Sequence, residues 1–167
     1  MTQEHVIRFT DKHNLDLYIY DASDAYIRYD TLFAGRNTKD YESDPRDLAP
    51  GKKPGDEERQ VACLLGFPVF AGPVRLSWHD LRDNLIEYTF NFEEIIPDRI
   101  IPHPEELNDL IIWENPFFLS RTPGIILEII DRTLNIFTVV DIGLLIPGTD
   151  DEVECLTHRA KVFSREF

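Results

Sequence analysis

The sequence has few cysteines and a marked shortage of basic residues. It holds only two cysteines, Cys63 and Cys155, which are too few for a disulfide framework. We therefore expect two free thiols, and we expect both to be buried because free cysteine is among the most buried residue types. The 17 lysines and arginines stand against 31 acidic residues, which gives a net charge of −14. This charge disfavours binding to the phosphate backbone of nucleic acids and to anionic membranes.

The sequence also lacks an uncharged apolar run of membrane-spanning length. Its most apolar stretch, 124–146, holds 14 large apolar residues but also Glu128, Asp131, Arg132 and Asp141. In a membrane-spanning helix these four charges would cost roughly 10–14 kcal/mol, whereas the apolar residues would return only roughly 4–8 kcal/mol. The stretch is therefore predicted to lie in a protein core. Because the N-terminal residues MTQEHVIRFTDKHNLDLYIYD carry charges throughout, we predict no secretory signal and a cytoplasmic location.

Motifs that identify common catalytic sites are absent. There is no P-loop, no G-x-G-x-x-G, no G-x-S-x-G and no H-E-x-x-H. The acidic residues of 40–47 have a superficial likeness to a calcium-binding loop, but Pro45 stands where the loop needs glycine and Gly51 where it needs glutamate. We predict no metal, no cofactor and no catalytic residues. Whether the chain is an enzyme stays open, with a non-enzyme preferred.

Alternation of apolar and polar residues indicates several β-strands. The clearest case is 85–93, LIEYTFNFE, in which every second residue is apolar over most of the run. This period predicts a strand with one buried side and one side facing solvent. Residues 74–78 alternate in the same way and predict its antiparallel neighbour. Residues 153–162 predict a last strand near the C-terminus.

Other segments are less regular. Residues 5–9 and 15–20 are rich in β-branched and aromatic residues and predict a hairpin. Residues 25–33 fit a third strand or a short helix equally well. Residues 125–130 fit a strand somewhat better than a helix, and 136–146 fit a strand more firmly, because isoleucine, valine, threonine and phenylalanine dominate both.

Pro104, followed by Glu105 and Glu106, predicts the start of a helix of about ten residues, because proline suits the first helical turn and acids suit the positive end of the helix dipole. Residues 37–60 contain three prolines, two glycines and few apolar side chains, and they predict a long exposed, mobile loop. The predicted class is α+β. We expect a β-rich single domain over residues 1–167, with mainly antiparallel sheet and one or two short helices.

The acidic residues are concentrated in 77–114, which holds ten acids and two bases. Like charges held close together cost stability, so we interpret this segment as a recognition surface for a basic protein partner. A solvated face that aids solubility is the alternative. After Pro116, two phenylalanines are the best candidates for an apolar patch at the same interface. The predicted partner-binding residues are Asp80, Asp83, Glu87, Glu93, Glu94, Glu105, Glu106, Phe117 and Phe118.

Small acidic domains without a catalytic signature include many inhibitors and immunity proteins that cover a basic toxin or enzyme. We therefore predict a cytoplasmic protein-binding module of this inhibitor or immunity type, which neutralises a basic partner and binds neither nucleic acid nor membrane. Two alternatives stay open. The chain could be a small ligand-binding domain or enzyme with a pocket lined by aromatic side chains, or a structural subunit of a larger assembly.

Overall fold

A computed structural model describes residues 5–36, 44, 46–149 and 151–167 of the chain. Strands dominate the described residues, and helices are limited to short turns. Most neighbouring strands are antiparallel. The predicted β-rich α+β class, with mainly antiparallel sheet, is confirmed.

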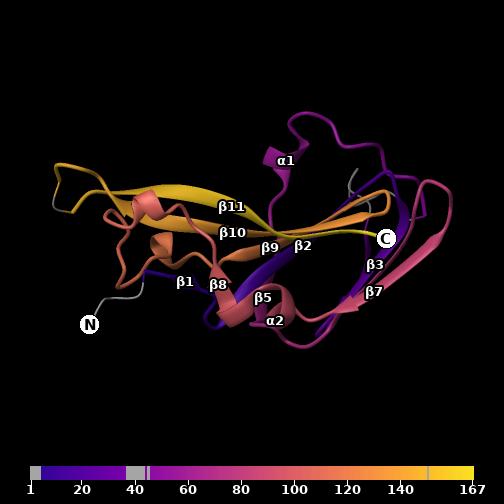
Figure 1. The fold of residues 1–167 in the computed structure, drawn as a ribbon, viewed down its shortest axis with the longest axis horizontal. Coiled ribbons are helices and arrows are strands. Elements are labelled where there is room, and N and C mark those ends of the chain that lie inside the picture. Colours follow the sequence, from indigo (N-terminus) through magenta and orange to yellow (C-terminus); the bar gives the residue numbers. More distant parts are fainter. Residues whose placement is uncertain (1–4, 37–43, 45, 150) are drawn as a thin grey trace.

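The larger sheet has five strands in the order β11-β10-β9-β2-β5. The strands are β2 (Lys12–Tyr20), β5 (Leu64–Pro68), β9 (Gly124–Ile130), β10 (Thr133–Leu145) and β11 (Val153–Glu166). β2 and β9 pair in parallel, and all other neighbours pair antiparallel. Figure 1 shows the long β10–β11 hairpin extending along the molecule past the end of β9.

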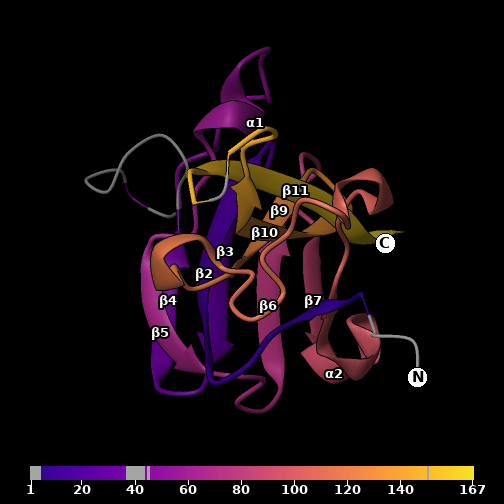
Figure 2. The same ribbon diagram turned by 90° about the vertical axis from the view of Figure 1, so that its left-hand side faces the viewer.

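The smaller sheet has four antiparallel strands in the order β4-β3-β6-β7. They are β3 (Ser23–Tyr29), β4 (Leu32–Arg36), β6 (Val74–His79) and β7 (Leu85–Phe90). In Figure 2 these strands stand side by side while β10 and β11 run across their direction. The predicted strand 74–78 lies in β6. The predicted strand 85–93 forms β7 only as far as Phe90, because Phe92–Ile95 makes a helical turn instead.

One hydrophobic core joins the two sheets. Alternate residues of the central strands point into it, as with Leu15 and Leu17 of β2, Trp78 of β6, and Ile125 and Leu127 of β9. These five side chains are at most 1% exposed. The apolar stretch 124–146 therefore builds β9 and β10. Asp131 makes the turn between them with a positive φ of 51°.

Short elements complete the fold. A two-stranded sheet pairs β1 (Ile7–Arg8) with β8 (Ile100–Ile101). Two single helical turns occur, α1 (Asp56–Arg59) and α2 (Phe92–Ile95), together with the 3-10 turns η1 (Pro97–Arg99), η2 (Glu105–Leu107) and η3 (Phe118–Ser120). None of the helices among the described residues has the length and apolar character needed to cross a membrane.

The predicted hairpin of 5–9 with 15–20 is wrong. The first segment pairs with β8 instead, and β2 pairs with β9 and β5. β2 lies inside the larger sheet, so its backbone hydrogen bonds go to strands that are distant in the sequence.

The ten-residue helix predicted from Pro104 is also wrong, because only the turn Glu105–Leu107 is helical. The backbone N–H of Leu145 donates to the carbonyl of Leu110, and Ile111 forms a bridge with Leu144. This segment therefore lies beside β10 beyond Val139, where the pairing of β10 with β9 stops.

The predicted loop 37–60 lies partly outside the described residues. Its described part is mostly exposed, but Ala49 and Gln60 are buried. Both cysteines are free, as predicted, but they are exposed rather than buried. Cys63 directly precedes the edge strand β5 and Cys155 lies on the edge strand β11, and neither side chain points into the core.

Candidate functional site

The outward face of the four-stranded sheet is the best candidate for a functional surface. Its inward residues, such as Leu76 and Ile86, are buried in the core. Strand geometry then directs the alternate residues to the opposite side. Those alternate residues include Arg28, Arg75 and Glu87, and all three are exposed. We call this outward surface the open face, because no described element packs on it.

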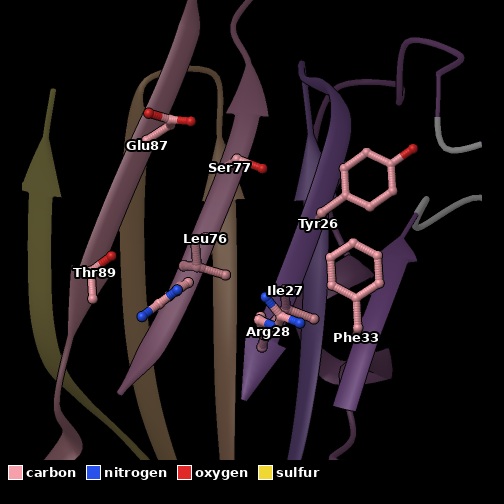
Figure 3. A pocket seen from close by; sticks show the side chains of 9 residues that line it. Tyr26, Ile27, Arg28, Phe33, Leu76, Ser77, Glu87 and Thr89 are labelled. Atoms are coloured by element: carbon pink, nitrogen blue, oxygen red, sulfur yellow. The ribbon is translucent and has the colours of Figure 1, made fainter. Parts of the chain in front are cut away.

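The register of the four strands arranges the open face into two cross-strand rows. Thr89 of β7, Arg75 of β6, Arg28 of β3 and Phe33 of β4 are successive partners, and we call this row the arginine rung. Glu87, Ser77, Tyr26 and Gly35 are partners in the same way, and we call this row the tyrosine rung. Figure 3 shows both rungs, with Glu87 and Thr89 on one side and Tyr26 and Phe33 on the other.

Aromatic rings occupy the β3–β4 side of the open face. The rings of Tyr26 and Phe33 stack with centroids 6.1 Å apart and planes 15° apart. The guanidinium carbon of Arg28 lies 5.6 Å from the centre of the Phe33 ring. Although Phe33 is a large apolar residue, 68% of it is exposed. Leu85, whose strand partner is His79, is 57% exposed at the opposite edge of the sheet, on β7.

Two shallow hollows flank the arginine rung. The first has a volume of about 440 Å³ and is lined by both rungs (Figure 3). The second, of about 390 Å³, is lined by Arg28, Asp30, Pro73 and Arg75 together with Tyr29 and Ala71. Both hollows thus share the two arginines. Tyrosine, phenylalanine and arginine are the residue types enriched at the centres of protein–protein interfaces.

A second polar cluster is buried on the other side of the molecule. Glu128 of β9 is 1% exposed. Its carboxylate accepts hydrogen bonds from Nζ of Lys52 at 2.8 Å, Nε2 of Gln60 at 2.8 Å and Nδ2 of Asn135 at 3.0 Å. Burial acts to raise the pKa of Glu128, but these three hydrogen bonds outweigh it, so that the pKa lies below its ordinary value. Glu128 is therefore ionised and holds segment 49–63 against the sheet.

Further contacts fix the same segment. The hydroxyl of Tyr18 donates to the carbonyl of Val61 at 2.7 Å and accepts from its N–H at 2.8 Å. Arg159 of β11 donates to Oε1 of Gln60 at 2.7 Å and lies over the ring of Phe137 at 3.8 Å. Most polar groups of this cluster bond to one another, although Nε of Arg159 is buried without a hydrogen-bond partner among the described residues, so we assign the cluster a structural role.

A third buried polar group is His13, which lies among aromatic rings. Its Nε2 is 2.7 Å from the hydroxyl oxygen of Tyr29, and the rings of Phe67, Phe70 and Phe92 surround it. Burial lowers the pKa of His13 and raises that of Tyr29 to about 12, so both groups are neutral near pH 7. His13 lines neither of the two hollows on the open face.

The predicted acidic surface is divided among separate elements. Glu87 lies on the open face, and Asp83 is exposed in the turn that precedes β7. Glu93 and Glu94 are in α2, at the opposite end of β7. The strand rises about 3.3 Å per residue, so these two sites are roughly 20 Å or more apart along it.

The remaining predicted acids are elsewhere. Glu105 and Glu106 are exposed in η2. Burial and the nearby His103 lower the pKa of His158 on β11, whereas Glu106 raises it. Glu106 is therefore close to β11 of the larger sheet. The acidic segment therefore does not form one continuous face.

Asp80 has a structural role that the sequence did not indicate. It is 3% exposed and pairs with NH1 of Arg132 at 2.6 Å. The backbone N–H of Asn84 has the largest effect in lowering its pKa to about 2, with further hydrogen bonds from Arg132 and Arg82. A carboxylate that is buried and already bound to these groups is not available to a partner.

The predicted phenylalanine patch is only partly accessible. Phe117 and Phe118 are half-buried, and Phe117 packs on the core and bridges to Ile142 of β10. The larger exposed apolar side chain nearby is Leu119, at 76%. Phe90 and Phe92, two other aromatic residues of the chain, are buried in the core.

Sequence reasoning missed Tyr26, Arg28, Phe33 and Arg75. A usable signal was present, because polar and apolar residues alternate in both 25–29 and 74–78. Comparison of the chain with protein-family models, with curated proteins and with solved structures finds no match. The candidate site therefore stands on its own geometry.

Proposed function

We propose that the protein is a protein-binding module that contacts its partner through the open face. The supporting observation is Phe33, a 68% exposed aromatic ring stacked on Tyr26 and flanked by Arg28. Exposed rings of this kind gain free energy when a partner covers them, since about 25 cal/mol is released per Å² of apolar surface buried. The shallow relief of the face suits a protein surface better than an enclosed small molecule.

The proposal is tested by substituting the aromatic pair. Immobilised wild-type protein would be incubated with a lysate of the cells that produce it, and bound proteins would be quantified by mass spectrometry. Parallel samples would carry Tyr26→Ala, Phe33→Ala or the control Leu65→Ala, whose side chain is 76% exposed on β5 of the other sheet.

We expect at least one protein whose capture falls about tenfold or more with Tyr26→Ala and Phe33→Ala and is unchanged with Leu65→Ala, because truncating a hot-spot residue costs 2 kcal/mol or more. Circular dichroism would verify that the variants are folded. If the three variants capture the same proteins to the same extent as wild type, the open face is not the binding surface.

An inhibitor or immunity-type role, in the cytoplasm and against a basic toxin or enzyme, is a second candidate. It is supported by the net charge of −14 and by the exposed carboxylates of the acidic segment, among them Glu87, Glu93, Glu94, Glu105 and Glu106. Reversal of these residues to lysine should weaken capture of a basic partner, and capture should fall steeply with added salt. Capture that is insensitive to both salt and charge reversal would refute this candidate.

A further inference from the structure

The arginine rung places two positive charges side by side on an acidic protein. Arg28 and Arg75 are register partners on neighbouring antiparallel strands, and both are exposed. Neither guanidinium has an acidic partner among the described residues. Like charges directly opposite each other in a sheet are destabilising. A sheet selected for stability alone would not need this pair.

The surroundings of the pair favour a bound anion. Phe33 supports one side of the Arg28 guanidinium, and a hollow lies on each side of the rung. The planar guanidinium group presents paired N–H donors that match the two oxygens of a carboxylate. Two such groups at neighbouring positions offer more N–H donors than one carboxylate can use. A carboxylate can therefore bind them in slightly different positions.

We propose that the arginine rung binds a carboxylate side chain on an extended acidic segment of the partner protein. This inference rests on the proposed function, because it assigns the partner's chemistry at the same surface. A nucleic acid would bring a dense row of phosphates against a protein of charge −14. A single carboxylate is attracted only by nearby charges, since salt screens the distant ones beyond about 8–10 Å.

Each hollow also contains one carboxylate, and these limit which segments fit. Glu87 lines the first hollow and Asp30 the second. Glu87 belongs to the tyrosine rung, two strand residues away from the arginine rung. In an extended segment, side chains at i and i+2 point the same way and are about 6.6 Å apart. The segment expected to bind therefore has an acid at one position and a base two residues away.

The test uses two synthetic peptides, acetyl-AEAKA-amide and its neutral counterpart acetyl-AQAKA-amide. Each is titrated into ¹⁵N-labelled protein to millimolar concentration, and the Nε–Hε signals of the arginines are followed by NMR. Arg28→Gln and Arg75→Gln assign the two signals. Arg82→Gln is the matched control, because Arg82 is exposed in the β6–β7 turn outside the open face. Inorganic phosphate is titrated separately.

We expect the glutamate peptide to shift the Arg28 and Arg75 signals with a millimolar Kd. The Kd should rise about tenfold for the glutamine peptide and for Arg28→Gln or Arg75→Gln, and stay unchanged for Arg82→Gln. Equal shifts from both peptides, or a shift of Arg82 as large as those of the pair, would overturn the proposal. So would phosphate that binds the pair as tightly as the glutamate peptide, since the rung would then be a general anion site.

Stability gives a second readout. Because the two arginines repel each other, each glutamine variant should keep or raise the thermal midpoint, by up to about 4 °C. A lower midpoint would mean that the pair supports the fold, and it would overturn the inference. The proposed function fails separately: if Phe33→Ala abolishes partner capture while Arg28→Gln and Arg75→Gln do not, the open face binds a partner but the carboxylate subsite is wrong.

Discussion

Removal of the Glu128 carboxylate should strongly destabilise the larger sheet. Glu128→Ala would leave the ammonium of Lys52 and the amides of Gln60 and Asn135 facing an empty volume, although each is now within 3.0 Å of a carboxylate oxygen. Breaking a buried ion pair by removing one partner costs about 3–5 kcal/mol. The side chain of Lys52 is 27% exposed and can regain some hydration, so we expect a value near 3 kcal/mol.

The free energy of unfolding is measured by urea denaturation, followed by tryptophan fluorescence, to which the buried Trp78 contributes. A loss of 3 kcal/mol corresponds to a thermal midpoint lower by about 6–12 °C for a chain of this length. Glu154→Ala is the control, because Glu154 is exposed on the neighbouring strand β11. A loss below about 1 kcal/mol for Glu128→Ala, or an equal loss for the control, would refute the reasoning.

The pH dependence of the same difference is a sharper test. The pKa of Glu128 in the folded protein is lowered from its ordinary value of 4.5. Its ionised form therefore adds stability that is fully present above pH 4.5 and is lost as the pH falls through the folded pKa. The stability difference between wild type and Glu128→Ala should shrink below pH 4.5. A difference that stays constant from pH 7 to pH 3 would show that the carboxylate's charge is not what holds segment 49–63.

Two further predictions concern the interior. Gly124→Ala should destabilise the protein by about 1–3 kcal/mol in urea denaturation, because the added Cβ would lie 2.7 Å from the Cβ of Ala62, and the double variant Gly124→Ala/Ala62→Gly should recover most of that loss. Burial lowers the pKa of His13 below 6.5, so the unfolded chain binds a proton more readily than the folded protein does. The free energy of unfolding should therefore fall as the pH drops below 6.5. His13→Gln should flatten this dependence between pH 6.5 and 5, and an unchanged dependence would contradict the assignment.

Local patterns predicted the strands but not their partners. The period of two in 74–78 and 85–90 arises because one side of each strand is buried, so apolar residues alternate with polar ones. Pairing depends on the whole chain. β2 and β9 are parallel neighbours more than 100 residues apart in sequence, and hydrophobic alternation contains no information about which strand lies next to which.

The failed helix after Pro104 shows a similar limit. Its proline and acids are suitable for a helix start, and one turn does form. The indole N–H of Trp113 then donates to the carbonyl of Asn108, and the N–H of Ile112 donates to the carbonyl of Gly143 on β10. In a helix the carbonyl of Asn108 would accept from Ile112 instead. A weak local preference is thus overridden by hydrogen bonds to a distant strand.

The candidate site was hidden for another reason. Alternation shows that Tyr26, Arg28 and Arg75 point away from the buried side, but it does not show whether another element covers them. The outward side of β9 carries the equally polar Glu128, which is buried under segment 49–63. Two sheets with similar outward patterns therefore differ in accessibility, and only the three-dimensional arrangement separates a covered polar cluster from an open binding surface.

The distribution of charge follows from the same geometry. A run of acids along the sequence becomes one face only if its elements stay together, and here the run passes from the β6–β7 turn through β7 and α2 to η2 beside the larger sheet. The negative charge is therefore spread over several sides of the molecule, where it repels anions at long range without marking one surface. Arg28 and Arg75 of the open face, which have no acidic partner among the described residues, make one positive site within that negative field. The net negative charge would repel an acidic segment at a distance, and the two arginines would bind it only on contact. Because salt screens the long-range repulsion, we expect the association rate of such a segment to rise with added salt, whereas the association rate of a basic partner would fall.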